Sequence, residues 1–183
     1  WVNSAGGNWS VPANWTNEES IVVAPQAGGR ATYTLNFNTA GTYTATHNLN
    51  AGFLLNRLNF GGSAVTLAGN FLAFTANGAT LPQINQNSAG GVTISAPLSL
   101  ATNLTLGGSG SGSVTISGGI SSTGSLTKTN SGTLTLSGAS TYSGGTTINT
   151  GSVALGSSAN DLLGRGPVIL NSPATLNLNG NNN

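Results

Sequence analysis

The sequence predicts an all-β solenoid, a fold in which short strands stack as successive coils along one axis. Apolar residues alternate with Thr, Ser and Ala over short stretches, and glycines punctuate these stretches at nearly equal intervals. Related phrases recur along the chain every 19 to 27 residues, which is typical of solenoid repeats. No segment shows the apolar period of a helix, so we expect strands and turns throughout.

The N-terminal region contains all three tryptophans of the chain, Trp1, Trp9 and Trp15. An aromatic-rich segment ahead of a solenoid favours a cap, because an uncovered first coil would expose its core and its strand edges. Clustered exposed rings could instead stack on sugars, as in carbohydrate-binding modules. We expect the cap and keep the sugar platform as the alternative.

Two alternating strands follow, Ala31–Phe37 and Thr42–Thr46, which a short turn joins. The only histidine, His47, comes directly after the second strand. Its sequence neighbours are polar, so we expect it at the surface or at a corner. A single histidine without cysteine or clustered acidic residues does not predict a metal site.

Six three-residue phrases mark successive coils. They begin 27, 22, 20, 19 and 23 residues apart (92−65, 114−92, 134−114, 153−134 and 176−153), and the drift indicates loop insertions at the corners. The phrases are Val65–Leu67, Val92–Ile94, Val114–Ile116, Leu134–Leu136, Val153–Leu155 and Leu176–Leu178. The inward-facing ladder that we predict from them consists mainly of Val92, Ile94, Val114, Ile116, Leu134, Leu136, Val153 and Leu155.

The clearest repeat is Gly132–Gly156, in which short alternating strands are separated by glycines that permit tight corners. We expect Tyr142 with Gly144–Gly145 to shape one of these corners. Asparagines are also frequent, notably around Asn56 and Asn59. Stacked amides can form hydrogen-bonded ladders along a solenoid, but the sequence does not decide which asparagines lie in register.

The C-terminal third resembles the autotransporter-associated β-strand repeats of large secreted bacterial surface proteins. Three phrases carry the resemblance: Gly132–Gly156, Leu163–Leu170 and Ala174–Asn182. The opening with Trp1, Asn8-Trp9-Ser10 and Asn14-Trp15-Thr16 is similar to the Trp-rich start of some such proteins. The resemblance implies a right-handed parallel β-helix in an extracellular or cell-surface protein. It supplies no catalytic residue.

Composition excludes several classes of function. Charged residues make up 4% of the chain and the net charge is +1, so there is no basic stripe to neutralise nucleic-acid phosphates. Cysteine is absent, which excludes disulfides and thiol chemistry. No apolar run reaches about 18 residues, so we expect no membrane insertion by a helix of this segment.

Catalysis is not expected either. Parallel β-helix enzymes that act on polysaccharides need clustered carboxylates or a calcium site. The chain has three carboxylates. Glu18 and Glu19 should point to opposite faces of an extended segment, and Asp161 lies far along the chain, where we expect it to serve a turn or an Asx cap. We therefore expect no catalytic residue, no cofactor and no metal.

The phrase Leu176–Gly180 begins another coil, yet the sequence continues only to Asn183 without an aromatic or charged cap. Exposed strand edges invite pairing. Two explanations remain open: the chain is a piece of a longer repeat protein, or its open end docks on another copy. We divide the chain into a Trp-rich cap with the first strands, 1–64, and solenoid repeats, 65–183, within one continuous domain.

Together these features predict a non-enzymatic extracellular structural protein, a rod that builds a surface fibre by head-to-tail self-association. In this hypothesis Leu176 and Leu178 of one copy meet the segment containing Trp1, Trp9 and Trp15 of the next. The alternatives are a carbohydrate-binding adhesion module, with surface glycans as partners, and a repeat segment of a larger autotransporter-like passenger.

Overall fold

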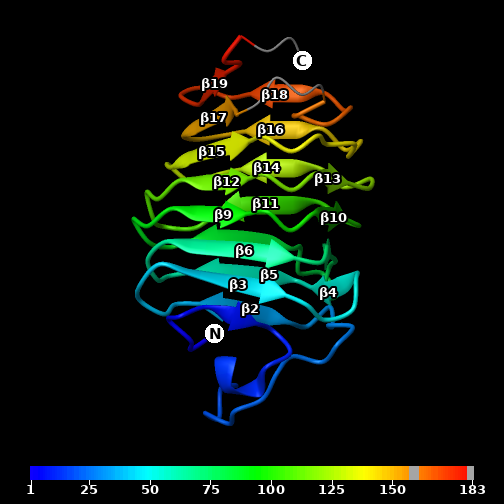
Figure 1. Cartoon of the computed structure of the whole chain (residues 1–183). Coiled ribbons are helices and arrows are strands. Elements are labelled where there is room, and N and C mark those ends of the chain that lie inside the picture. The colour runs from blue at the N-terminus through cyan, green and yellow to red at the C-terminus, as the bar shows by residue number, and fades with distance from the viewer. Residues whose placement is uncertain (157–160, 181–183) are drawn as a thin grey trace.

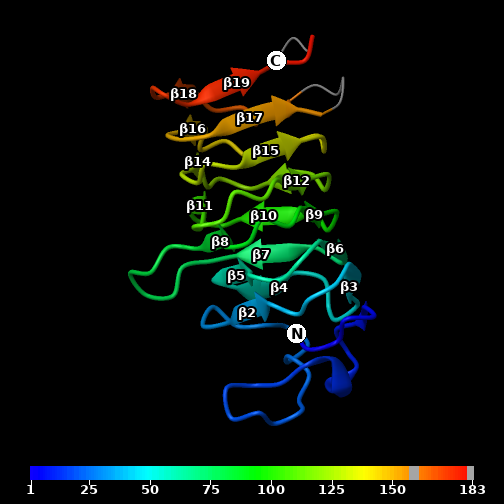
Figure 2. The ribbon, with the colours of Figure 1, turned by 90° about the vertical axis from the view of Figure 1, so that its left-hand side faces the viewer.

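Three parallel β-sheets form the walls of a solenoid that rises along one axis (Figures 1 and 2). The computed structural model describes residues 1–156 and 161–180. The N-terminal residues lie at the lower end of Figure 1, and β18 and β19 lie at the upper end. The all-β, parallel solenoid expected from the repeats is confirmed.

Sheet 1 is the longest sheet, and every one of its pairings is parallel. From the lower end upward its strands are β1 Gly7–Asn8, β3 Tyr43–His47, β6 Val65–Gly69, β9 Val92–Ile94, β12 Val114–Ile116, β15 Thr133–Leu136, β17 Ser152–Leu155 and β19 Thr175–Asn177. The first residues of the six repeat phrases pair with one another in succession, from Val65 with Val92 to Val153 with Leu176. The loop insertions therefore change the corners without shifting the register.

The other two walls complete each coil. Sheet 2 consists of β4 Phe53–Leu55, β7 Leu72–Phe74, β10 Leu98–Leu100 and β13 Ile120–Ser121. Sheet 3 consists of β2 Thr34–Phe37, β5 Arg57–Phe60, β8 Gln83–Gln86, β11 Leu104–Gly107, β14 Leu126–Lys128, β16 Thr146–Ile148 and β18 Val168–Leu170. A coil such as β6, β7 and β8 visits the three walls in turn. Above β13 the described chain forms no further strand in sheet 2, and buried Tyr142 lies in the connection from β15 to β16.

The expected strands at 31–37 and 42–46 exist as β2 and β3, but they belong to different sheets. The turn between them carries the chain around a corner of the solenoid from sheet 3 to sheet 1. β3 pairs with β6, and β5 pairs with β8, so parallel pairing crosses the boundary at residue 64 without a break. A single 3-10 turn in the described chain, Pro12–Asn14, lies in the cap.

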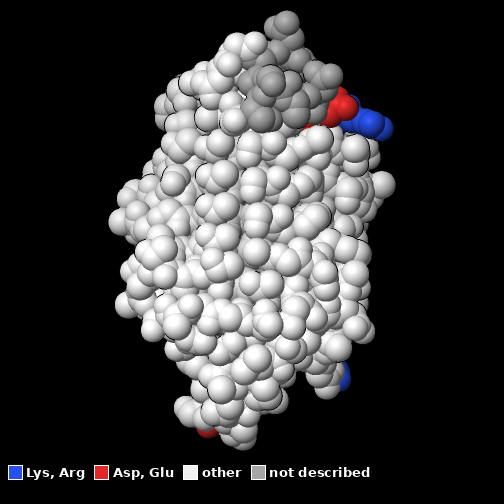
Figure 3. Space-filling model, in the orientation of Figure 1, with Lys and Arg blue, Asp and Glu red and all other residues white. Residues whose placement is uncertain are grey.

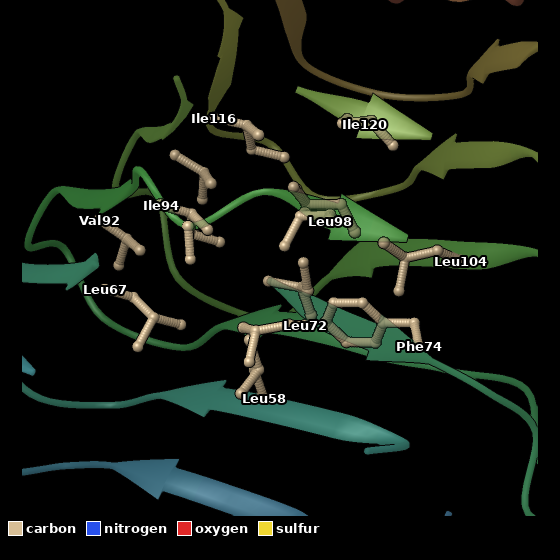
Figure 4. Close-up of a cluster of buried hydrophobic side chains, with 14 of the residues drawn as sticks. Leu58, Leu67, Leu72, Phe74, Val92, Ile94, Leu98, Leu104, Ile116 and Ile120 are labelled. Atoms are coloured by element: carbon tan, nitrogen blue, oxygen red, sulfur yellow. The ribbon is translucent and has the colours of Figure 1, made fainter. Parts of the chain in front are cut away.

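Apolar side chains from all three walls meet along the axis (Figure 4). Within β9, Val92 and Ile94 point inward and are buried, whereas Thr93 between them points outward, as strand alternation requires. In Figure 4 the side chains of sheet 1 face those of Leu72 and Leu98 from sheet 2. Each buried aliphatic side chain contributes roughly 1.5–3 kcal/mol, so the stacked ladders stabilise the rod.

Close stacking of coils explains some of the glycines. Gly108 has a φ of +104°, and a Cβ there would lie 2.2 Å from the Gln86 carbonyl oxygen of the coil below. Gly69 has a φ of +103°, and a Cβ there would lie 2.1 Å from the His47 carbonyl oxygen. Both positions require the left-handed conformation and leave no room for a side chain.

Candidate interaction surfaces at the two ends and walls

The three tryptophans form one buried cluster at the lower end. The exposed fractions of Trp1, Trp9 and Trp15 are 7%, 0% and 4%. The Trp15 ring meets Trp1 and Trp9 edge to face, with ring centroids 5.1 Å and 5.3 Å apart. The Trp15 Nε1 also donates a hydrogen bond of 3.0 Å to the Trp9 carbonyl oxygen. The cluster combines large apolar burial with a satisfied indole donor.

This cluster closes the interior of the first coil. The Trp9 ring lies 6.0 Å from Phe37 of sheet 3 and 5.3 Å from Phe53 of sheet 2, and Trp1 stacks on Tyr43 of sheet 1 at 6.2 Å. Each wall thus supplies at least one aromatic side chain that contacts the cap. The burial leaves no exposed indole face, so the tryptophans do not form the exposed sugar platform considered from the sequence.

The sequence predicts His47 at the surface or at a corner, and the surface placement is wrong. Its side chain is fully buried, with its ring 4.6 Å from the Trp9 ring and 5.1 Å from the Phe53 ring. Alternation explains the difference, because His47 ends β3 on the inward face while its polar neighbours Thr46 and Asn48 are less buried. Burial lowers the pKa of His47 to about 4.

An open groove of about 560 Å³ lies beside the cap. It runs between β2 and the 16–26 segment, and its lining includes Trp15, Tyr33, Leu35 and, as its charged member, Glu18. Near it the lower end also exposes the apolar run Ile21, Val22 and Val23, which are 53%, 56% and 48% exposed.

The upper end is open. All three residues of β18 are exposed, and Leu178 is 42% exposed while Leu176 is partly buried against the core. A second groove, of about 600 Å³, lies between the segment 161–168 and the last coil. Arg165 Nε and Asp161 Oδ2 form a 3.9 Å ion pair at its rim. The expected Asn-rich tail at 181–183 lies outside the described residues.

The predicted ladder residues all lie on the inner side of sheet 1 and are at most 1% exposed; they are Val92, Ile94, Val114, Ile116, Leu134, Leu136, Val153 and Leu155. Their stacking is in register from coil to coil. They form the interior of the rod, so surface contacts must come from other positions. Of the predicted assembly residues, Leu176 and Leu178 line the upper groove, Trp1 and Trp15 line the lower groove with little exposure, and Trp9 is fully buried.

The outer walls carry polar ladders. On sheet 1 one outward column is threonine in five successive coils: Thr44, Thr66, Thr93, Thr115 and Thr135. On sheet 3 the Asn85 Nδ2 donates to Asn59 Oδ1 at 2.9 Å, and the Asn59 Nδ2 donates to Asn36 Oδ1 at 2.7 Å. Asn56 instead lies inside, where its amide donates to the carbonyl oxygens of two residues of the 75–80 loop. The register therefore decides which asparagines stack.

Charged side chains are confined to the two ends on the face that Figure 3 shows. A buried cation, which the sequence reasoning did not single out, lies inside. The Lys128 Nζ donates to the Asn130 carbonyl oxygen at 2.6 Å, the Asn130 Oδ1 at 2.9 Å and the Thr150 carbonyl oxygen at 3.0 Å. Burial lowers the pKa of Lys128 to about 8. Strand alternation from Leu126 was the available signal, because it places Lys128 on the inward face.

Asp161 lies far from the neighbouring pair Glu18 and Glu19. Glu18 lines the lower groove and Asp161 lines the upper one. Asp161 has a φ of 60° and directly precedes the turn at 162–163, and its carbonyl oxygen accepts a hydrogen bond from the Ser140 N–H. Within residues 1–156 and 161–180 no three His, Asp or Glu side chains gather as metal ligands would. In the same residues no helix has the length and hydropathy needed to span a membrane.

Comparison with known proteins identifies one repeat. Residues 126–155, from β14 to β17, match a family model described as the passenger-associated-transport-repeat. No curated protein and no solved structure matches the chain. The match and the β-solenoid together fit an autotransporter passenger-type repeat, which confirms the resemblance seen in Gly132–Gly156. Such a repeat suggests a secreted or surface protein.

Proposed function

We propose that the chain is a non-enzymatic structural rod of a secreted or cell-surface protein, which extends by end-to-end association. The asymmetry of its two ends carries this proposal. Aromatic side chains seal the lower end, whereas the upper end leaves the apolar positions of β18 and Leu178 open to solvent. An apolar surface that continues a core is normally covered by another element.

The stacked coils suit a mechanical role. Backbone hydrogen bonds run along the axis with a rise of about 4.8 Å per coil, so six coils span about 30 Å. The walls between the ends carry threonine and asparagine ladders in place of ion pairs. Hydrogen bonds between neutral groups depend little on salt, so the rod should keep its shape over a wide range of ionic strength.

A contact between two different ends does not close on itself unless its rotation forms a ring, so the expected product is an open filament. The tryptophans are at most 7% exposed, so the neighbouring copy could reach only the surfaces of Trp1 and Trp15 that line the groove. The exposed apolar run 21–23 and the groove beneath β2 are the lower surfaces available for that contact. Few charges are available at either end, and the association should survive high salt because it depends mainly on apolar burial.

Association can be tested by analytical ultracentrifugation and electron microscopy of the chain over a range of concentrations. Replacing Leu176 and Leu178 with Lys should leave monomers, because two ammonium groups would enter the contact. Thr115→Lys is the matched control on the outer wall, where it should leave assembly unchanged. A wild-type chain that stays monomeric at high concentration contradicts the proposal.

The passenger-type repeat supports a second candidate, in which the open end is covered by a further coil of a longer polypeptide. Expression with additional downstream repeats would then give longer monomeric rods. In either case we propose that the chain has no hydrolase or lyase activity, because Asp161 lies at the opposite end from Glu18, and Glu18 and Glu19 are sequence neighbours expected to point to opposite faces. Turnover of a polysaccharide that Asp161→Asn abolishes would contradict this. An adhesive role toward glycans would have to use the outer walls or grooves.

A further inference from the structure

The cap covers the lower edges of two of the three sheets. Under sheet 1, β1 pairs with β3 and the Trp9 N–H donates to the Thr46 carbonyl oxygen at 2.9 Å. Under sheet 2, the Leu54 N–H donates to the Gly28 carbonyl oxygen at 3.0 Å, and the Arg30 N–H donates to the Leu54 carbonyl oxygen at 2.8 Å. These two edges are closed to strand addition.

Sheet 3 is different, because in the described residues no segment of the cap pairs as a strand or bridge with β2, its terminal strand at the lower end. The Tyr33 and Phe37 carbonyl oxygens accept bonds from the coil above, so alternation turns the backbone groups of Thr34 and Asn36 toward the lower end. There the Trp1 nitrogen donates to the Asn36 carbonyl oxygen at 2.8 Å. No strand of the described chain pairs with β2 on this side.

The groove described above lies along this edge. Its volume of about 560 Å³ falls within the roughly 300–1,000 Å³ of ordinary binding sites. Tyr33 and Leu35 contribute to the apolar lining, and Thr34 and Asn36 belong to the same lining. The groove therefore combines a strand edge that pairs with no other strand with a partly apolar lining, which is what strand addition requires, and the bond from the Trp1 nitrogen to Asn36 would have to give way.

The complementary element lies at the other end of the same sheet. β18 is the upper terminal strand of sheet 3, and its inward positions Val168 and Leu170 are 42% and 49% exposed. The residues beneath them, Thr146 and Ile148, are buried in the preceding coil. Within the described residues no strand covers β18, so its exposure does not come from a polar sequence.

We propose that β18 of one copy enters the groove of the next copy and pairs in parallel with β2, so that sheet 3 continues across the contact. This inference rests on the end-to-end association proposed above. The three residues of β18 measure about 10 Å in extended conformation. Thr34 and Ile169 belong to one outward column of sheet 3, so the existing register would place them side by side across the contact and direct Leu170 toward Leu35.

A second copy fits this groove better than an unrelated peptide. β18 has the strand direction of sheet 3, its inward positions are apolar, and it is terminal in the sheet that the groove leaves unpaired. Arg165 precedes it and Glu18 lines the groove, so the charges near the two surfaces include an opposite pair. β18 and the groove belong to the same polypeptide, so the two partners are always present at equal concentration.

Cysteine cross-linking tests the register directly, because the chain has no native cysteine. Adjacent Cα atoms across parallel strands lie about 4.8 Å apart, within the roughly 4.4–6.8 Å that a disulfide spans. A mixture of Thr34→Cys and Ile169→Cys variants should give disulfide-linked heterodimers under mild oxidation. Thr34→Cys with Val168→Cys, which points to the other face, should give none.

Thr34→Pro provides a second test. It removes a backbone N–H that faces the groove and keeps the bonds to β5, as edge strands allow. We expect a folded monomer by circular dichroism and ultracentrifugation, whereas Thr34→Ala should assemble like the wild type. If oligomers form but neither cross-link nor respond to Thr34→Pro, the β18–β2 pairing is wrong and end-to-end association stands. If the wild type never associates, both proposals fail.

Discussion

The His47 ring lies 4.6 Å from the Trp9 ring, at the joint between the cap and the first coil. His47 ends a strand of sheet 1, and Trp9 belongs to the aromatic cluster beneath it. Neither residue is exposed to solvent. Protonation of the buried His47 imidazole would therefore place a charge against the cap and lower its stability.

Acid should destabilise the protein through His47. Its pKa is about 4 when folded and near 6.5 when unfolded, so between these values the unfolded chain binds more protons. The neutral, buried His47 contributes fully to the free energy of unfolding above pH 6.5. As the pH falls toward 4, roughly 2–3 kcal/mol of that stability is lost. Urea unfolding at pH 7.5 and 4.5 measures it. In His47→Phe the free energy of unfolding should differ less between these two pH values than in the wild type. An equal difference would show that another group causes the acid effect.

Raising the pH above 8 should stabilise the protein through Lys128. Its pKa is about 8 when folded and near 10.5 when unfolded, so the free energy of unfolding should rise from pH 8 toward 10. Above pH 10 the raised pKa values of Tyr43 and Tyr142, about 12 for each, reverse the trend because the unfolded phenols ionise first. Denaturant titrations between pH 7 and 10 test the rise.

Lys128→Met is the companion variant. It removes the donor that serves three oxygens, so we expect a loss of about 1–3 kcal/mol at pH 7 and no rise between pH 8 and 10. A variant as stable as the wild type at pH 7 would show that these oxygens find other donors.

Leu134→Asp should prevent folding, because it places an unpaired charge in the ladder at a position with no exposure. The expected cost is several kcal/mol, comparable to the whole stability of a domain of this size. Thr135→Asp is the matched control, since Thr135 points outward in the same strand. Far-UV circular dichroism separates the two. A folded Leu134→Asp variant would refute the inward assignment of Leu134.

Gly108→Ala should destabilise the stack by more than about 1 kcal/mol, because it combines a positive φ with a Cβ 2.2 Å from the Gln86 carbonyl oxygen. Gly78→Ala is the control, because Gly78 also has a positive φ but no atom within 4 Å of the added Cβ. Thermal unfolding should show the larger loss for Gly108→Ala. Equal losses would attribute the effect to φ alone.

Trp9→Ala should remove much of the cap and cost about 3–5 kcal/mol, because the side chain is fully buried among aromatic rings. Trp9→Phe keeps an aromatic ring and should lose less. Unfolding followed by tryptophan fluorescence and by circular dichroism would report the cap and the coils separately. A folded, equally stable Trp9→Ala variant would contradict the capping role.

Much of the fold could be predicted from short-range pattern. The phrases from Val65 to Leu178 recur because each coil needs one inward-facing strand in sheet 1, and loop insertions change their spacing without shifting their register. His47 shows where this reasoning fails. Its neighbours are polar because they point outward, so local polarity gave the wrong answer and strand parity gave the right one.

The sequence by itself determined the class of the fold, the inward ladders and the place of the aromatic cap, because alternation and repeat period are local properties of the chain. Tertiary structure alone decided which side chains meet across coils about 20 residues apart. It placed Asn59 between Asn36 and Asn85, gave Lys128 its three oxygen partners, and left β2 and β18 as the open strands of one sheet. These contacts depend on the strand register and on how the cap folds against the first coil, and the period of the repeats determines neither.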